Sequence, residues 1–386
     1  MQRSKLFVVL PRIPWPLEKG DKLRAYYFLE GLSKKHDIFL FALYRKKYDK
    51  ESQLKIENIV KQYYFFKISI FELLLNAFFA LFTKKPFQVA YFSNYFMKRK
   101  ISKLAKIEKP DVVFCQLVRT AHYVKGLNCK KIIDYQDTLS LGMKRRADLA
   151  TGLKRKLFQV ESSRLLKYEK LIENWFDERI IITEQDLLHL PVNKNEVHII
   201  ANGVDTDFYY DSKKENANEI LFVGNMSYAP NVNAVEFFCT KIFPEIVKKI
   251  PNAVFYIVGA DPHWKVKTLA SDNVVVTGWV NDSRIYYERC AVFVAPMQIG
   301  TGLQNKLLEA MSMTRACVTT SLANNALGAV HEKNILIADS VDEWVEKVLY
   351  LLENSSERKQ IASNARNFVL ENYSWNAQIE KLNKII

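Results

Sequence analysis

The stretch APMQIGTGLQNKLLEAMSM, residues 295–313, contains the pattern that decides the fold. The apolar run Val292–Ala295 predicts a buried strand, and the amphipathic run Leu303–Ser312 predicts the helix that follows it. Gly300 and Gly302 lie in the connecting loop and would let a ligand approach the backbone closely. Ligands of open α/β sheets bind beyond the carboxyl ends of strands, where the next helix begins with a partial positive charge. The stretch therefore predicts a diphosphate site at a strand–loop–helix corner.

Two charged residues of this predicted helix lie three positions apart and share a face, Lys306 and Glu309. A cation at this place would neutralise a diphosphate, and a carboxylate farther along would accept two hydrogen bonds from a ribose diol. The alternative is that both are exposed residues that form a weak ion pair with each other.

Other predicted strands end in similar corners. Gly224-Asn225 follows the strand Ile220–Val223, and Gly259 follows its neighbour Val254–Val258. In the first half, the strand Leu6–Leu10 runs through prolines to Gly20-Asp21 and then into a helix. Each corner alone is a weak signal, but together they predict phosphate-capable loops on two domains that face one crevice.

Short, continuously apolar strands alternate with helices in both halves of the chain, which indicates parallel sheets that are covered on both faces. We therefore predict an α/β protein of two doubly wound domains joined near Asn202–Tyr210. The remaining predicted strands are Ile38–Ala42, Val112–Cys115, Ile132–Tyr135, Ile180–Thr183, Val197–Ile200, Val274–Thr277, Ala316–Thr319 and Ile335–Ile337.

Length and composition agree with two globular domains. The chain has 386 residues, of which 49% are hydrophobic and 25% charged, with only 12 glycines and 11 prolines. These values exclude disordered and collagenous chains. We find no apolar run of the roughly 20 residues that a spanning helix needs, and we expect no signal peptide, because the first residues lack the pattern of one. The five cysteines are widely scattered, so we expect reduced thiols in a cytoplasmic protein.

The net charge of +14 lies entirely in the first half. Residues 1–200 contain 38 Lys and Arg against 21 Asp and Glu, whereas residues 201–386 contain 18 against 21. The basic half could face a membrane surface, an anionic substrate or nucleic acid, or it could be no more than a soluble basic face. We expect no nucleic-acid partner, because no recognition motif accompanies the charge.

Several catalytic signatures are absent from the sequence, among them the P-loop, G-x-G-x-x-G, G-x-S-x-G and H-E-x-x-H. Asp205-Thr206-Asp207 could hold a metal and a nucleotide sugar, but it lies in the segment between the domains, where acidic loops are common. We therefore expect no metal and no cofactor.

The sequence resembles a known family over nearly its whole length. It is similar to family 4 glycosyltransferases of the GT-B fold, close to the sugar transferases of exosortase and exopolysaccharide systems. The order and spacing of its motifs carry the resemblance, and these motifs are Gly20–Arg24, Ile199–Asp205, Phe222–Asn231, Ile257–Gly259, Thr277–Val280, Gly300–Met311, Ala365-Arg366 and Tyr373–Trp375.

The resemblance implies GT-B architecture, two Rossmann-like domains facing across a cleft, and metal-free transfer of a sugar with retention of configuration. The donor, a UDP- or GDP-sugar, would bind the second domain, with Glu309 on its ribose. Thr301 stands where the family has the first Glu of its E-x7-E pattern, and Asn225 and Asn231 stand near the usual diphosphate clamp, so Lys306 is our candidate for the compensating cation. The full set of predicted donor-binding residues is Gly20, Asp21, Gly224, Asn225, Gly259, Trp279, Val280, Gly300, Thr301, Gly302, Lys306 and Glu309.

Three residues of the first domain are candidates for the chemistry, which requires stabilisation of a developing sugar cation. Asp134 and Asp137 lie at the end of the strand that begins at Ile132. Asp137 is the better candidate for orienting a sugar, because Asp134 could equally cap the next helix. His122 is a weaker alternative base, since a lone histidine is more often structural.

The run Ile68–Phe82 has 12 apolar residues of 15 and is too short to span a membrane. It is either a domain helix with one buried face or a helix that lies in a membrane interface beside Lys/Arg clusters. These clusters are Arg45–Lys47, Lys98–Lys100, Lys144–Arg146 and Lys154–Lys156.

Together these observations predict a glycosyltransferase at the inner face of the cell membrane, acting on a lipid-linked oligosaccharide or a surface polysaccharide precursor. We expect an acceptor-binding, membrane-facing domain at 1–203, a nucleotide-sugar domain at 204–365, and a helix at 366–386 that returns to the first domain. Two alternatives stay open, a GT-B sugar-nucleotide epimerase and a non-enzymatic protein that binds anionic surfaces.

Overall fold

The chain folds into two compact units. The computed structural model describes residues 3–17, 19–45, 48–210, 215–299 and 302–386. One unit comprises Met1–Asn202 with Gln378–Ile386, and the other comprises Gly203–Ala377. The last nine residues are therefore grouped with the first unit, whereas residues 366–377 of the expected returning segment are part of the second.

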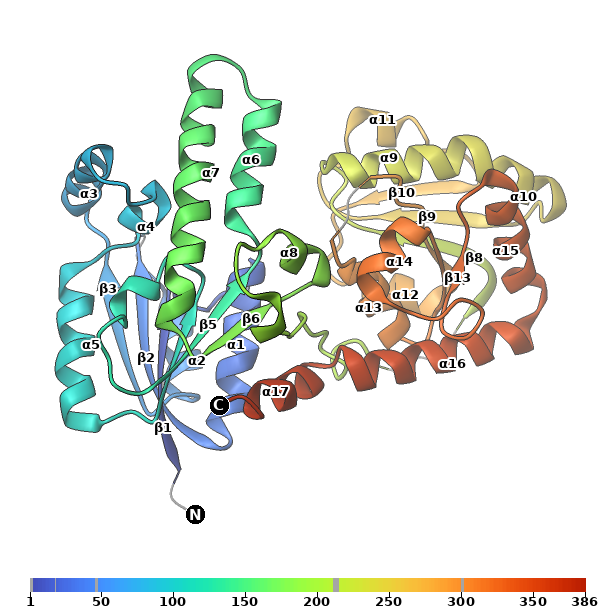
Figure 1. Ribbon diagram of the computed structural model, residues 1–386. Helices are drawn as coiled ribbons and strands as arrows, with labels where there is room; N and C mark the ends of the chain where they lie inside the picture. The colour runs from blue at the N-terminus through green and yellow to red at the C-terminus, as the bar shows by residue number, and fades with distance from the viewer. Residues whose placement is uncertain (1–2, 18, 46–47, 211–214, 300–301) are drawn as a thin grey trace. The chain divides into compact units, whose positions relative to one another are not determined.

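The first unit contains a seven-stranded parallel sheet in the order β3-β2-β1-β4-β5-β6-β7 (Figure 1). The interior strand β1 pairs with β2 on one side and β4 on the other, and its residues from Leu6 to Leu10 are at most 2% exposed. The strands are β1 (Ser4–Leu10), β2 (His36–Tyr44), β3 (Gln62–Lys67), β4 (Val112–Gln116), β5 (Lys130–Gln136), β6 (Glu178–Ile181) and β7 (Val197–Ile199).

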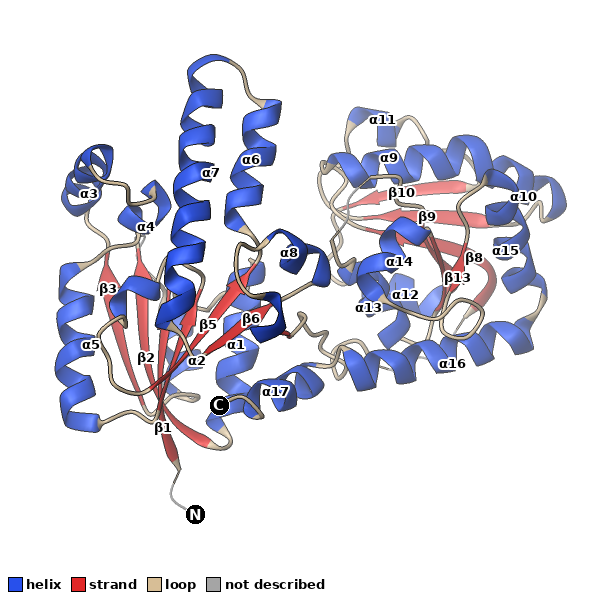
Figure 2. Cartoon of the chain, in the orientation of Figure 1, coloured by secondary structure: helices blue, strands red, loops and turns tan. Residues whose placement is uncertain are grey.

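Helices connect these strands and cover the sheet (Figure 2). The α-helices are α1 (Gly20–Ser33), α2 (Lys50–Glu57), α3 (Ile70–Phe82), α4 (Phe87–Tyr91), α5 (Tyr95–Glu108), α6 (Leu139–Leu149), α7 (Gly152–Ile172) and α8 (Glu184–His189). Short 3₁₀ turns occur at η1 (Ala121–Tyr123), η2 (Glu173–Trp175) and η3 (Lys194–Glu196).

The second unit contains a six-stranded parallel sheet in the order β10-β9-β8-β11-β12-β13. Its strands are β8 (Asn216–Val223), β9 (Val254–Val258), β10 (Val274–Gly278), β11 (Cys290–Ala295), β12 (Ala316–Thr319) and β13 (Leu336–Ile337). Its helices are α9 (Ala229–Phe237), the π-helix η4 (Phe238–Ile242), α10 (Phe243–Lys249), α11 (Trp264–Lys267), α12 (Arg284–Arg289), α13 (Asn305–Ser312), α14 (Ser321–Leu327), α15 (Val341–Glu353) and α16 (Ser355–Asn372).

Continuous apolar sequence explains why both sheets are parallel and covered on both faces. All six residues of β11 are buried, and helices lie on both sides of the sheet that contains it. The predicted doubly wound α/β fold is thus confirmed for each unit.

The final helix, α17 (Trp375–Asn383), begins in the second unit and ends in the first. Its Ile379 packs on α1 at Gly31, where an added Cβ would lie 2.2 Å from Ile379 Cδ1. Only glycine permits this approach. At the start of the second unit, Val204 forms a β-bridge with Ser374, and its N–H donates to the carbonyl of Tyr373 at 2.8 Å.

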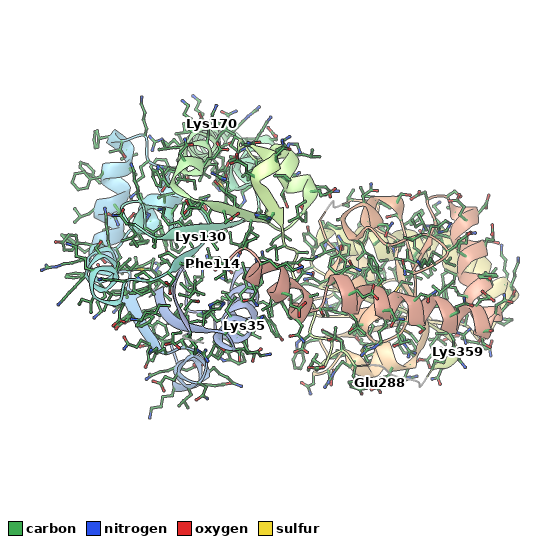
Figure 3. The ribbon with its side chains drawn as sticks, turned by 60° about the horizontal axis from the view of Figure 1, so that its bottom comes forward. Lys35, Phe114, Lys130, Lys170, Glu288 and Lys359 are labelled. Carbon is green, nitrogen blue, oxygen red and sulfur yellow. The ribbon has the colours of Figure 1, made fainter. Side chains whose placement is uncertain are left out.

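Helix α3 and the antiparallel pair α6–α7 lie at the carboxyl ends of the strands of the first sheet, and the α6–α7 hairpin projects well beyond them (Figure 1). Figure 3 shows Lys170 on the exposed face of α7 and Phe114 of β4 in the interior of the same unit. Within the described residues, no helix combines the length and the apolar character needed to cross a bilayer.

Candidate active site

The strand–loop–helix corner at β11 and α13 holds Lys306 in a defined position. Its Nζ donates to Oδ1 of Asn231 at 2.5 Å and lies 4.2 Å from the centroid of the Phe222 ring. Burial lowers the pKa of Lys306 to about 7, and the charge of Glu309 opposes this shift. The amine thus carries a positive charge only in part at neutral pH, and a bound diphosphate would favour its protonated form.

Glu309, one turn further along α13, has a different partner. The hydroxyl of Tyr287, which is fully buried, donates to Oε2 of Glu309 at 2.9 Å. Burial raises the pKa of Glu309 to about 7, against hydrogen bonds from Tyr287 and Tyr209 and the charge of Lys306. The alternative of an exposed Lys306–Glu309 ion pair is therefore wrong, because each side chain is held by its own neighbours.

Two of the predicted glycines lie where β8 and β9 end side by side. Gly259 has φ +148°, and a Cβ there would lie 1.8 Å from the carbonyl oxygen of Gly224. A Cβ on Gly224 would in turn lie 2.6 Å from Nδ2 of Asn231 and 3.2 Å from Nζ of Lys306. The absence of side chains keeps this corner narrow and brings the lysine to the backbone of the β8 loop.

A cavity of about 320 Å³ opens beside this corner, at the carboxyl ends of β8, β9 and β10. We call it the second-unit cavity. Four of the predicted donor-binding residues line it, namely Gly224, Gly259, Trp279 and Val280. Phe208 and Tyr209 line it as well. These two were missed by the sequence analysis because they precede the first strand of this unit and carry no motif.

The other predicted donor-binding residues of this unit have varied positions. Asn225 accepts hydrogen bonds from the N–H and hydroxyl of Ser227, so its side chain stabilises the turn after β8. Gly302 is exposed just before α13. Gly300 and Thr301 lie outside the described residues.

In the first unit, the structure argues against a catalytic role for Asp134. Both carboxylate oxygens accept from Arg24, at 2.7 and 3.2 Å, and neither side chain has exposed surface. Arg24 also donates to the carbonyl of Ala201 and to Asn202. Through Arg24, Asp134 therefore links β5 to α1 and to the segment Ala201-Asn202. It neither reaches a substrate nor caps the next helix.

Asp137 remains accessible just after β5. Neighbouring protein atoms desolvate the carboxylate in part and raise the pKa of Asp137 to about 6; the charge of Asp186 adds to this shift, while Arg119 opposes it. A carboxyl group with this pKa can hold or release a proton near neutral pH, which suits a group beside a reacting sugar.

His122 is a poor candidate for a base. Burial, together with the charges of Lys85 and Lys98, lowers its pKa to about 3, so it binds a proton very weakly. Its Nε2 lies 3.3 Å from the hydroxyl oxygen of Ser93, and its ring packs on Tyr123. These contacts are those of a structural histidine.

The predicted corner at Gly20-Asp21 forms the start of α1. The carboxylate of Asp21 pairs with Arg12, and the backbone carbonyl of Asp21 accepts from Gln116 Nε2 at 2.8 Å. Beside this corner, at the carboxyl ends of β1 and β2, lies a cavity of about 920 Å³, which we call the first-unit cavity. Both units therefore carry a cavity at the edge where ligands of α/β sheets bind.

The acidic pair considered for a metal has a local role. Oδ1 of Asp205 accepts from the N–H groups of Asp207 and Phe208, at 3.1 and 2.9 Å, and so stabilises a turn. Within the described parts of the chain, no three His, Cys, Asp or Glu side chains are grouped so as to hold a metal ion.

A comparison with known protein families finds a match in the second unit, which contains the corner at α13 and the second-unit cavity. Residues 217–354 match the family model described as Glycosyl transferases group 1. This span includes most of the second unit, with Glu309, Lys306 and most of the second-unit cavity. The two parallel sheets are those of the GT-B fold, which the solved structures described below share, and the family match lies within the second unit.

One relative matches over most of its length. The "Uncharacterized 44.6 kDa protein in cps region" of Klebsiella pneumoniae is 24% identical over 390 residues, which cover 96% of each chain. Two crystal structures share the fold at lower identity. A glycosyltransferase from Rickettsia africae ESF-5 is 13% identical with a TM-score of 0.64 over 100% of this chain and 98% of its own. Anabaena Alr3699/HepE in complex with UDP is 12% identical, with a TM-score of 0.66 over 99% and 98%.

Proposed function

We propose that the protein is a retaining glycosyltransferase that moves a sugar from a UDP- or GDP-sugar to a lipid-linked oligosaccharide or a surface polysaccharide precursor. The observation that carries the proposal is the corner at α13, where Lys306 and Glu309 are held apart by separate partners beside the second-unit cavity. The chemistry of a nucleoside diphosphate fits this corner, with a cation for the phosphates and a carboxylate for the ribose diol.

Two relatives support the choice of donor and of acceptor pathway. The Anabaena protein has been crystallised with UDP-glucose, which makes UDP-sugars the first donors to test. The Klebsiella relative is described by its position in a cps region, which favours a polysaccharide precursor as the acceptor.

The proposed transfer needs no metal. Lys306 and the N-terminus of α13 would neutralise the leaving diphosphate, as a divalent cation does in other transferases. Asp137 is our candidate for orienting the transferred sugar or the acceptor, because it is the accessible carboxylate at the end of β5.

We further propose that the first unit docks on the anionic lipid surface at the inner face of the cell membrane. Helix α3 has inverted polarity: Glu72 and Asn76 bond to the body of the unit through Asn94 and the carbonyl of Ser93. Its apolar residues face outward instead, with Ala80 as its one buried residue. The side chains that are at least 55% exposed are Ile70, Phe71, Leu74, Phe78, Phe79, Leu81 and Phe82. The reading of α3 as an ordinary helix with a buried apolar face is therefore wrong.

Positive charge accompanies this apolar surface. The tip of the α6–α7 hairpin carries six exposed cations and the exposed side chains of Leu153 and Leu157. These cations are Lys144, Arg145, Arg146, Lys154, Arg155 and Lys156. Because α3 and the hairpin lie at the same end of the sheet (Figure 1), one anionic lipid surface fits both.

The test of the enzymatic proposal separates donor binding from transfer. Nucleotide sugars are screened for thermal stabilisation, where a ligand at 100 times its Kd adds about 2.7 kcal/mol. The best donor is then incubated with and without a lipid-linked glycan, with and without chelator. Transfer that needs the acceptor and survives the chelator supports the proposal. Donor turnover without any acceptor would instead indicate an epimerase or a hydrolase, and a strict metal requirement would refute the metal-free mechanism.

A further inference from the structure

The first-unit cavity combines aromatic side chains with a large excess of positive charge. Five of the described residues that line it are cationic, namely Arg12, Lys19, Lys22, Arg45 and Arg119. Asp49 is the one carboxylate among the described lining residues, and it is already engaged as the N-cap of α2, where it accepts from the N–H of Ser52 at 2.7 Å. Arg12 is also paired with Asp21, which leaves the other four cations of the lining without a carboxylate at ion-pair distance in the described chain. A cavity with this composition repels cations and attracts an anionic ligand.

Arg119 is the most informative of these cations. Its Nε and Nη2 both donate to Oε1 of Gln88, a neutral acceptor, and no carboxylate lies within ion-pair distance of it in the described chain. Burial and the charge of Arg12 lower the pKa of Arg119. The carboxylates of Asp137 and Asp21 oppose this shift, but they lie farther from Arg119 than an ion pair allows. A partly buried guanidinium without an ionic partner is costly to the free protein. The expected reason for keeping it is a ligand that supplies the negative charge.

The aromatic groups of the cavity place this charge beside a surface for a sugar. The guanidinium carbons of Arg12 and Arg119 lie 5.7 and 5.0 Å from the centroid of the same Phe92 ring. Trp15, Tyr44 and Tyr91 also line the cavity. The C–H groups of a pyranose face carry a slight positive charge and pack on the negative face of an aromatic ring. The volume of about 920 Å³ is at the upper end of the range of about 300–1,000 Å³ for small-ligand sites.

We propose that the first-unit cavity binds an anionic sugar as the acceptor, with the phosphate or carboxylate group on Arg119 and Arg12 and the sugar ring against the aromatic side chains. This inference rests on the proposed function, in which the first unit binds the acceptor. It names the acceptor's chemistry: the negative group is either the phosphate that links a glycan to its lipid or the carboxylate of a uronic acid. Guanidinium groups bind both in a bidentate manner.

Ligand-observed NMR on the full chain tests the proposal with three probes: glucose 1-phosphate, glucuronate and methyl glucoside. Saturating UDP is present throughout, so that the probes do not report on the diphosphate site of the second unit. We expect at least one anionic sugar to bind about tenfold more tightly than methyl glucoside, and the better of the two shows which anion is recognised. Equal binding of all three probes, or binding of none, would overturn the proposal.

Variants assign the effect to the cavity. Arg119→Gln should remove the preference for the anionic sugar without lowering the melting temperature, because it removes an uncompensated charge. Lys100→Gln is the matched control, since it also removes one positive charge and one cation–π contact, here to Tyr64 at 4.4 Å. If Arg119→Gln does not fold, Lys22→Gln must weaken the preference. A preference that survives in the folded cavity variant would refute the assignment.

The same samples keep this proposal distinct from the enzymatic one. Titration of UDP without sugar probes measures the second-unit site alone, and Arg119→Gln should leave that affinity unchanged. If the wild type does not bind UDP, the donor assignment is refuted. The sugar titration still tests the assignment of the first-unit cavity in that case.

Discussion

The affinity for a nucleotide sugar should depend on pH with a maximum near 7. In the proposed function, binding requires Glu309 as a carboxylate, which accepts from the ribose, and Lys306 as an ammonium, which contacts the diphosphate. Burial brings the pKa of both groups to about 7, upward for Glu309 and downward for Lys306. Below pH 7 the carboxylate becomes protonated, and above pH 7 the ammonium loses its proton, so affinity falls in both directions.

The size of the effect follows from these two values. If both groups titrate near 7, about a quarter of the molecules carry the competent charge pair at pH 7 and about 3% carry it at pH 5.5 or 8.5. The affinity at either extreme should therefore be about eightfold lower than at pH 7, which corresponds to about 1.2 kcal/mol.

Calorimetric titration with UDP-glucose measures this profile without interference from the ligand, because its diphosphate has no terminal phosphate group. Lys306→Met should remove the decrease on the alkaline side. Glu309→Gln should remove the decrease on the acid side, and its amide oxygen can still accept from Tyr287, so that the fold is kept. The exposed pair Lys265 and Glu236, 3.6 Å apart in the same unit, provides the matched controls Lys265→Met and Glu236→Gln.

A wild-type affinity that is constant between pH 5.5 and 8.5 would refute the proposed roles of Lys306 and Glu309. An unchanged pH profile in the Lys306 and Glu309 variants would refute them as well, because the pair would then not contact UDP-glucose.

Three further predictions concern the framework and the membrane. Arg24→Met leaves Asp134 charged without its partner inside the first unit, and we expect a loss of about 3–5 kcal/mol in denaturant unfolding; a loss below 1 kcal/mol would contradict the role assigned to this ion pair. Gly259→Ala forces a Cβ against the carbonyl oxygen of Gly224 and should lower the melting temperature and nucleotide affinity together, whereas Gly126→Ala, with no atom within 4 Å, should change neither. The wild type should sediment with anionic but not neutral vesicles, and salt should release it. Binding should be weaker in a variant with Gln in place of the six cations of the α6–α7 hairpin, and also in the triple variant Phe71→Ser/Phe78→Ser/Phe82→Ser. Equal binding of the wild type to neutral vesicles would refute the electrostatic contribution.

The sequence was sufficient for the sheets because their strands are buried on both faces. A strand such as β11 has no polar position, so its short apolar run is a clear signal. β3 was missed for the opposite reason: its QYYFFK sequence lies at the sheet edge, with four half-buried and two exposed residues, and has neither alternation nor a fully apolar run. The orientation of α3 could not be predicted from the sequence either. Its residues show that the helix has an apolar face, but they do not show whether that face points to the core or to the surface.

The arrangement of the candidate site could be predicted where it depends on local order but not where it depends on distant contacts. Lys306, Glu309 and the two strand-end glycines follow from the strand–loop–helix pattern. Their partners do not, since Asn231 is 75 residues from Lys306 and Tyr287 is 22 from Glu309. Arg119 was not singled out either, because the absence of an ionic partner is a property of the folded surroundings and leaves no trace in spacing.

The β-bridge between Val204 and Ser374 has a consequence for how such enzymes could be rearranged. The chain enters the second unit at 203 and leaves it at 377, and the bridge holds these two ends beside each other. A unit with adjacent ends can be exchanged as a single cassette. Because the second junction falls inside α17, the incoming cassette must continue that helix in register, so that Ile379 still meets Gly31. Under the proposed function, a chimaera built this way would combine the nucleotide preference of one protein with the acceptor surface of another.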